Sequence, residues 1–294
     1  MRDYVIATAS TCDLDRTWLD EHQVPFISYT FIIDDHSYND DCTEKTKEFI
    51  LDQMKQDKPV STAAISVYAY EQFFEKILQQ GRDIIFLDMT KALSSSFSNA
   101  VMASRDLQEK YPDRKIAVID TNAVTLILGL LLKEAVAMHE SGSDFDEVVS
   151  WIETNKNNFV GRFMVNDLKW LRHGGRLSNA SAIVGSLLSI KPLIIVDDDG
   201  KLVAYNKIRG RQKCLHTLIE DVAKSMTDET PKHETALIFS GEKEDGEAFR
   251  QEFMAAYPDL HNVGLYRLGP VIMGHIGPGF LAVVIYGKGR EPKA

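Results

Sequence analysis

The sequence has few cysteines and no arrangement of them that suggests a disulfide framework or a zinc site. Its three cysteines, Cys12, Cys42 and Cys214, include no C-x-x-C pair. Scattered thiols of this kind are typical of reduced proteins of the cytosol. The eight histidines likewise show no H-E-x-x-H motif or paired metal-ligand spacing. We therefore expect neither a metal site nor a cofactor.

The chain also lacks a long apolar run. The longest strongly apolar run, VTLILGLLL at residues 124–132, has about half the length of a membrane-spanning helix and is typical of a buried one. The first residues, MRDYVIATAS, resemble a short strand and not a signal peptide. We expect a cytoplasmic protein without stable membrane insertion. A net charge of -10 further argues against nucleic-acid binding, which normally needs a basic face.

Familiar catalytic motifs are missing as well. No G-x-G-x-x-G follows the first apolar run, and neither a G-x-x-x-x-G-K-[ST] loop nor a G-x-S-x-G elbow occurs. The sequence therefore carries none of the signatures of dinucleotide binding, P-loop nucleotide binding or α/β-hydrolase chemistry.

Strand and helix patterns alternate along the chain. Short apolar runs at residues 4–10, 25–33 and 83–89 predict strands, the last of the kind buried in parallel sheets. Residues 43–56 begin with a threonine cap and space their apolar side chains by three and four, which predicts a helix. An Asp-Gly pair between the two apolar runs of residues 191–208 indicates a β-hairpin.

This alternation predicts an α/β architecture. The pattern restarts near residue 159, and 294 residues suffice for two domains. We expect an N-terminal α/β domain over residues 1–158 and a C-terminal α/β domain over residues 159–294.

Two hydroxyl-rich clusters lie at the ends of predicted elements. The first, STAAIS at residues 61–66, contains Ser61 and Thr62, and helix capping is its simplest role. The second, LSSSFSNA at residues 93–100, contains Ser94 and Ser95, and its three consecutive serines exceed what one cap needs. Hydroxyls and free N–H groups at a helix start can also hold an anion.

Two further clusters combine glycine with one basic or imidazole side chain. In LRHGGRLSNAS, residues 171–181, a double glycine precedes Arg176, which is typical of a turn with a surface arginine. In LGPVIMGHIGPGFLAV, residues 268–283, His275 stands among glycines in an apolar run. A structural core histidine is one interpretation. The other is a strand or turn where glycine lets the backbone approach a ligand.

The four clusters contain hydroxyls, a histidine and an arginine, but no carboxylate that could orient the histidine as a base. That set suits binding of an anion through hydrogen bonds better than hydrolysis. The basic segment NKIRGRQK at residues 206–213, with Arg209 and Arg211, is compatible with a solvated face, a helix start or a docking patch.

Taken together, ASTCDL, LSSSFSNA, LRHGGRLS, the segment from IKPLI to RGRQK, and GHIGPG resemble the DegV family over essentially the whole chain. This family comprises the fatty-acid-binding subunits of bacterial fatty acid kinase. The resemblance implies two α/β domains with an acyl chain in a tunnel between them. It also implies a non-catalytic carrier that presents the ligand carboxylate to an ATP-dependent kinase.

Carried over by position, the resemblance implies ligand-binding roles for six residues: Ser61, Thr62, Ser94, Ser95, Arg176 and His275. It does not distinguish Ser61 from Thr62. We take Arg209 and Arg211 as candidate residues for docking the kinase. Two alternatives remain open, namely an esterase or acyltransferase that uses Ser94 or Ser95 with His275, and a regulatory module that binds another amphipathic anion.

Overall fold

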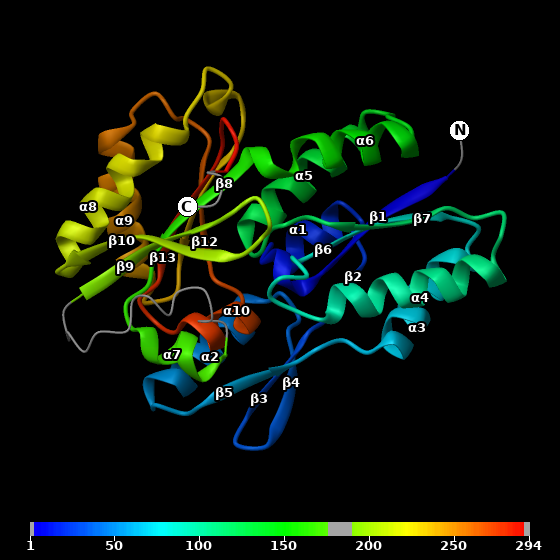
Figure 1. Cartoon of the computed structure of the whole chain (residues 1–294), viewed down its shortest axis with the longest axis horizontal. Helices are drawn as coiled ribbons and strands as arrows, with labels where there is room; N and C mark the ends of the chain where they lie inside the picture. Colours follow the sequence, from blue (N-terminus) through cyan, green and yellow to red (C-terminus); the bar gives the residue numbers. More distant parts are fainter. Residues whose placement is uncertain (1–2, 176–189, 291–294) are drawn as a thin grey trace.

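The computed structural model describes residues 3–175 and 190–290, and within them the strands form three sheets (Figure 1). Strands between residues 4 and 120 build a four-stranded and a three-stranded sheet, and strands between residues 159 and 286 build a six-stranded sheet. The predicted α/β fold is confirmed. The domain boundary near residue 158 stays a prediction.

The four-stranded sheet is parallel, in the strand order β2-β1-β6-β7. Its strands are β1 (Tyr4–Ala9), β2 (Phe26–Ile27), β6 (Asp83–Asp88) and β7 (Ile116–Asp120). Its helices are α3 (Val67–Leu78), α4 (Ser96–Lys110), α5 (Leu126–Glu140) and α6 (Phe145–Asn155). Figure 1 shows α5 and α6 on one side of the sheet and α3 and α4 on the other. Strands β1 and β6 are therefore buried at every residue.

The three-stranded sheet is antiparallel, in the order β4-β3-β5. It consists of β3 (Thr30–Ile33), β4 (His36–Asn39) and β5 (Val60–Ala63), and α2 (Glu44–Lys55) connects β4 to β5. The single strand predicted over residues 25–33 is wrong, because β2 and β3 belong to different sheets. Between β2 and β3 lies Tyr29, whose backbone N–H donates to Ser10 Oγ (3.1 Å).

The six-stranded sheet is mixed, in the order β10-β9-β8-β13-β11-β12, with β11 and β12 parallel. Its strands are β8 (Phe159–Met164), β9 (Ile190–Val196), β10 (Leu202–Arg209), β11 (Thr235–Phe239), β12 (Val263–Arg267) and β13 (Leu281–Tyr286). Strands β9 and β10 form the predicted hairpin.

The two faces of the six-stranded sheet belong to two different cores. Along β13, Leu281, Val283 and Ile285 pack with α8 (Arg211–Val222) and α9 (Lys243–Ala256). The intervening Ala282 and Val284 belong instead to the core shared with the first half of the chain. This alternation follows from the two-residue period of a strand. One face of the sheet is thus free to wall a space between the two halves.

Shorter helices complete the described part of the chain. They are α1 (Arg16–Glu21), α7 (Leu168–His173), α10 (Pro270–Ile276), and the 3-10 turns Ser10–Cys12, Lys156–Asn158, Ala223–Ser225 and Thr230–Lys232. The strand or turn expected around His275 is wrong, because this residue lies on α10. Proline at the first position starts that helix, and Gly277, with φ +86°, ends it.

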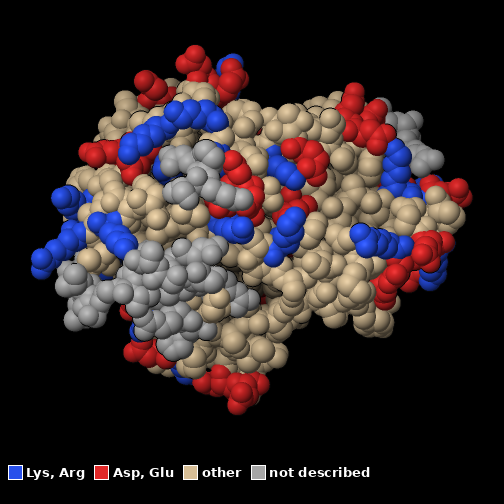
Figure 2. Space-filling model, in the orientation of Figure 1, with Lys and Arg blue, Asp and Glu red and all other residues tan. Residues whose placement is uncertain are grey.

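The surface carries charges of both signs. On the face in Figure 2, acidic and basic side chains are interspersed. Over the part of the chain that the structure describes, every helix is too short or too polar to cross a membrane.

A capping box starts α6 and gives a local test of this architecture. Asp144 accepts the Glu147 N–H, and the Glu147 side chain accepts the Asp144 N–H, both at 2.9 Å. We expect Asp144→Ala to lower the free energy of unfolding by about 1 kcal/mol, because the Glu147 N–H loses its acceptor. Urea unfolding measures this loss, and Asp144→Ser, which keeps a cap, serves as the control. Equal losses in both variants contradict the capping role.

Candidate functional site

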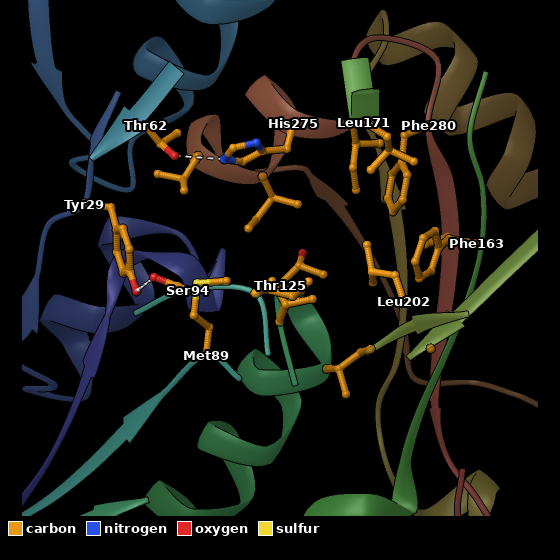
Figure 3. Close-up of a pocket in the computed structure, with 18 of the residues that line it drawn as sticks. Tyr29, Thr62, Met89, Ser94, Thr125, Phe163, Leu171, Leu202, His275 and Phe280 are labelled. Carbon is orange, nitrogen blue, oxygen red and sulfur yellow. Dashed lines mark hydrogen bonds between the residues drawn. The ribbon is translucent and has the colours of Figure 1, made fainter. Parts of the chain in front are cut away.

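A cavity lies between the two halves of the chain, and the space between atoms in it amounts to about 870 Å³ when open solvent is included. Figure 3 shows Tyr29, Thr62, Ser94 and His275 toward one end and Phe163, Leu202 and Phe280 toward the other. The apolar end also includes side chains of β11 and β13, namely Ile238, Ala282 and Val284. The cavity is therefore amphipathic along its length.

A hydrogen bond joins the two halves of the chain at the polar end. Thr62 Oγ1 lies 2.8 Å from His275 Nε2. Thr62 shares a face of β5 with the buried Val60, whereas Ser61 points the other way and is exposed. The strand register thus places Thr62 in the cavity wall and Ser61 outside it. The first cluster belongs to a strand, and the helix cap there is Ser66 at the start of α3.

The glycines beside His275 allow close packing of protein on protein. A Cβ atom on Gly274 would lie 2.7 Å from Val60 Cγ1, and one on Gly277 would lie 2.0 Å from Trp170 Cδ1. Gly174 in turn lets α7 approach the His275 ring. We expected these glycines to let the backbone approach a ligand. Those next to His275 instead let α10 approach β5 and α7, which brings the imidazole to the cavity.

The three consecutive serines before α4 have different environments. Ser94 Oγ accepts the Ser96 N–H (3.2 Å) and so caps the helix, and it also lines the cavity. Ser95 is exposed at the cavity wall and makes no side-chain cap. Ser96 is buried, and its hydroxyl accepts the Ile65 N–H (3.0 Å). Ser94 and Ser95 thus both face the cavity.

A buried carboxyl group behind Ser94 was not anticipated from the sequence. Asp88 ends strand β6, and its carboxylate accepts the Tyr70 hydroxyl and the Met89 N–H, both at 2.7 Å. The Tyr29 hydroxyl lies 3.5 Å from Asp88 Oδ1 and 3.4 Å from Ser94 Oγ. Burial raises the pKa of Asp88 to about 6. In the sequence, only the position of Asp88 at the end of a buried strand could have indicated this carboxyl group.

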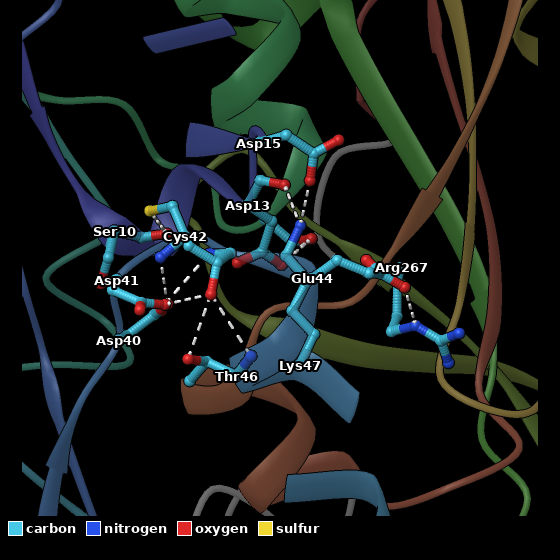
Figure 4. A network of polar contacts seen from close by, with 12 residues as sticks. Ser10, Asp13, Asp15, Asp40, Asp41, Cys42, Glu44, Thr46, Lys47 and Arg267 are labelled. Carbon is cyan, nitrogen blue, oxygen red and sulfur yellow. Dashed lines mark hydrogen bonds and ion pairs between the residues drawn. The ribbon is translucent and has the colours of Figure 1, made fainter. Parts of the chain in front are cut away.

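A second buried acid reaches the cavity through Thr125, which lines it at the start of α5. Thr125 Oγ1 donates to Asp13 Oδ2 (2.5 Å), and burial raises the pKa of Asp13 to about 6. Figure 4 shows the surrounding network, in which buried Lys47 Nζ lies 2.7 Å from Asp15 Oδ1 and 3.4 Å from the Asp13 carbonyl. These contacts fix α2 against the loop that supports the cavity wall.

The same network joins the two halves of the chain. Arg267 on β12 is almost fully buried, and its Nε donates to Glu44 Oε1 on α2 (2.5 Å). Nearby, Asp40 accepts the Cys42 N–H (3.1 Å) and is fully buried. Burial, together with the neighbouring Asp13 carboxyl group, raises the pKa of Asp40 to about 7.

The candidate arginines have different positions. Arg176 lies outside the described residues. Arg209 is exposed at the end of β10, whereas Arg211 is partly buried and its Nη1 donates to the Gly279 carbonyl (2.9 Å). Gly279 directly precedes Phe280, a cavity-wall residue, so Arg211 also supports the wall.

The described part of the chain contains no group of three or more His, Cys, Asp or Glu side chains that could hold a metal ion. Its three cysteines are free and buried. The partner of His275 Nε2 is Thr62, and the Ser94 hydroxyl contacts Ser96 and Tyr29. A hydrolase would need the serine hydroxyl on the imidazole, whereas these contacts join Ser94 and His275 Nε2 to other groups.

Asp40 gives a pH-dependent test of the buried network. Its raised pKa means that the folded protein holds a proton that the unfolded chain releases above about pH 4. Its contribution to the free energy of unfolding is therefore greatest at low pH and falls as the pH rises toward about 7. We expect Asp40→Asn to gain stability relative to the wild type between pH 5 and pH 8 in urea unfolding.

The adjacent Asp41 is the matched control. Partial burial opposes its ionisation, but hydrogen bonds from Thr46 and Thr43 hold the pKa of Asp41 below its usual value. Asp41→Asn is therefore expected to lose stability relative to the wild type as the pH rises through the acidic range. Parallel pH profiles for Asp40→Asn and the wild type contradict the account.

Comparisons with known proteins agree with this fold. A model of the DegV family, described as an uncharacterised protein family, matches residues 4–288. A DegV domain-containing protein of Clostridium perfringens is 33% identical over 294 residues, which cover 99% of this chain and 100% of the relative. The DegV domain-containing protein YteA of Lactococcus lactis is 29% identical and covers 98% of this chain and 99% of its own.

Solved structures of DegV proteins have the same architecture. The fatty acid binding DegV family protein SAG1342 of Streptococcus agalactiae superposes with a TM-score of 0.84 at 27% identity, over 100% of both chains. A stearic acid-binding protein of Eubacterium ventriosum gives a TM-score of 0.84 at 26% identity, over 96% of this chain and 98% of its own. From the family model and the relatives together, this chain belongs to the DegV family.

Proposed function

We propose that this protein binds a long-chain fatty acid in the cavity and presents its carboxylate to an ATP-dependent fatty acid kinase. The observation that carries the proposal is the polarity of the cavity, with hydroxyl and imidazole groups toward one end and aliphatic and aromatic walls toward the other. The solved relatives named for fatty acid binding support the same ligand class.

The energetics of such a ligand match the two ends of the cavity. Burying about 14 methylene groups at about 0.8 kcal/mol each contributes about 11 kcal/mol before the costs of binding. An unpaired carboxylate would cost several kcal/mol to bury, so hydrogen-bond donors must meet it. Thr62, Ser94, Ser95 and His275 supply these donors, and the start of α4 adds a favourable dipole.

In this proposal the protein breaks no bond and needs no cofactor of its own. The kinase transfers phosphate from ATP to the presented carboxylate and forms an acyl phosphate. The basic segment with Arg209 and Arg211 docks the kinase by charge complementarity. A cytoplasmic location without nucleic-acid binding fits this role, because ATP and the kinase are available there.

Solvent extraction of the purified protein followed by mass spectrometry tests the ligand assignment. We expect about one fatty acid per chain, or full loading after addition of fatty acid. A protein that neither carries nor takes up fatty acid contradicts the proposal. Turnover of a p-nitrophenyl acyl ester that is lost in His275→Ala would favour the esterase alternative.

The polar end can be tested by removing single donors. Hydrogen bonds to charged groups contribute about 1.5–3 kcal/mol, so Thr62→Val, Ser94→Ala and His275→Gln should each weaken fatty-acid affinity by about 10- to 100-fold. Isothermal titration with a long-chain fatty acid measures the affinity. Ser61→Ala, one residue away but exposed, is the matched control and should bind like the wild type. Equal effects at positions 61 and 62 contradict the assignment.

The docking patch can be tested by reversing single charges. We expect Arg209→Glu to retain fatty-acid binding and to lower the rate of acyl-phosphate formation by the kinase about tenfold, since exposed charges guide association. Arg211→Glu should impair the same step, and it should also loosen the cavity wall at Gly279. The control is Arg105→Glu, an exposed site on α4. A wild-type rate in Arg209→Glu contradicts docking at this patch.

A further inference from the structure

A chain of hydroxyl groups leads from the polar end of the cavity to a buried carboxyl group. Ser94 Oγ lines the cavity and lies 3.4 Å from the Tyr29 hydroxyl, which lies 3.5 Å from Asp88 Oδ1. Figure 3 shows Tyr29 and Ser94 side by side at this end. Asp88 itself is completely buried. A ligand carboxylate on Ser94 would therefore face a second carboxyl group two hydroxyls away.

When the ligand carboxylate and Asp88 are both ionised, the two hydroxyl groups between them supply one hydrogen too few for the three contacts. An ionised carboxylate can only accept hydrogen bonds, and a hydroxyl has a single hydrogen to donate. The ligand, Ser94, Tyr29 and Asp88 make three consecutive contacts, but Ser94 and Tyr29 together supply only two hydrogens. One contact is then left as a pair of facing acceptors in a buried site, which is unfavourable.

We propose that fatty-acid binding is coupled to the uptake of one proton by Asp88, which reverses the direction of this hydrogen-bond chain. Without ligand, Tyr29 donates to an ionised Asp88, and Ser94 donates to Ser96. With ligand, the proton enters from solvent and the protonated Asp88 donates to Tyr29, Tyr29 to Ser94, and Ser94 to the ligand carboxylate. The inference rests on the proposed function, because it needs the carboxylate at Ser94.

The surroundings of Asp88 favour a proton at this position. Burial and the negative charge of Asp120, at the paired position of β7, both favour it, whereas the hydrogen bonds from Tyr70 of α3 and from the Met89 N–H stabilise the ionised form. Lys91 lies 3.4 Å from Asp120 and not at Asp88. Burial already raises the pKa of Asp88 to about 6 without ligand, and a bound carboxylate raises it further. The protonated state is therefore reached near neutral pH.

Titration calorimetry in buffers of different ionisation enthalpy counts the protons taken up per fatty acid. At pH 7.5 we expect the wild type to take up about one proton more than Asp88→Asn, whose side chain cannot ionise. Because binding raises the pKa of Asp88, wild-type affinity should fall up to about tenfold per pH unit above about 6 relative to this variant. The matching fatty alcohol should cause no such uptake.

Three further variants locate the proton. Tyr29→Phe keeps the Asp88 charge but removes the connecting hydroxyl, so uptake should fall as in Asp88→Asn. Asp120→Asn removes a neighbouring charge but keeps the Asp88 carboxyl group and its burial, which is the main cause of its raised pKa, so most of the uptake should persist. Because His275 is a second ionisable group at the polar end, the difference made by Asp88→Asn is measured again in His275→Gln, where it should persist.

The outcomes separate this inference from the proposed function. A wild-type protein that binds no fatty acid at any pH contradicts the proposed function. A wild-type protein that binds fatty acid, but takes up as many protons as Asp88→Asn or Tyr29→Phe, contradicts only the coupling of binding to proton uptake by Asp88. A loss of uptake in Asp120→Asn equal to that in Asp88→Asn contradicts the assignment to Asp88.

Discussion

The hydrogen bond between Thr62 and His275 is the contact on which the arrangement of the cavity depends. It joins residues 213 positions apart, one on a strand of the first half and one on a helix of the second. Without the packing of α10 on β5, the His275 imidazole would not lie beside the Thr62 hydroxyl in the cavity wall. The pairing of the two halves thus turns a gap between sheets into a site for an amphipathic molecule.

Two buried acids each lie behind a hydroxyl group that lines the cavity. Asp13 and Asp88 lie behind the cavity-lining hydroxyls of Thr125 and Tyr29, and burial raises the pKa of each to about 6. Each carboxyl group fixes a hydroxyl that faces the cavity, at the cost of holding an acid in a dry environment. The protein therefore trades some stability at neutral pH for fixed hydroxyl groups, a common compromise at binding sites.

Much of the local structure could be predicted from the sequence, because the signals are local. The capping box at Asp144, the Asp-Gly hairpin and the buried apolar runs each depend on neighbouring residues. The helix around His275 was missed, because an apolar run with glycines shows no helical period. Thr62 could not be distinguished from Ser61 before the register of β5 was known. Asp88 was missed because its partners, Tyr29 and Tyr70, are distant in sequence.

A crystal structure of the protein with a long-chain fatty acid tests the central claim most directly. The account predicts a carboxylate within about 3 Å of the Thr62 and Ser94 hydroxyls, near His275, with the tail running toward Phe163 and Leu202. A carboxylate at the Phe163 end, or a ligand bound outside this cavity, would contradict it.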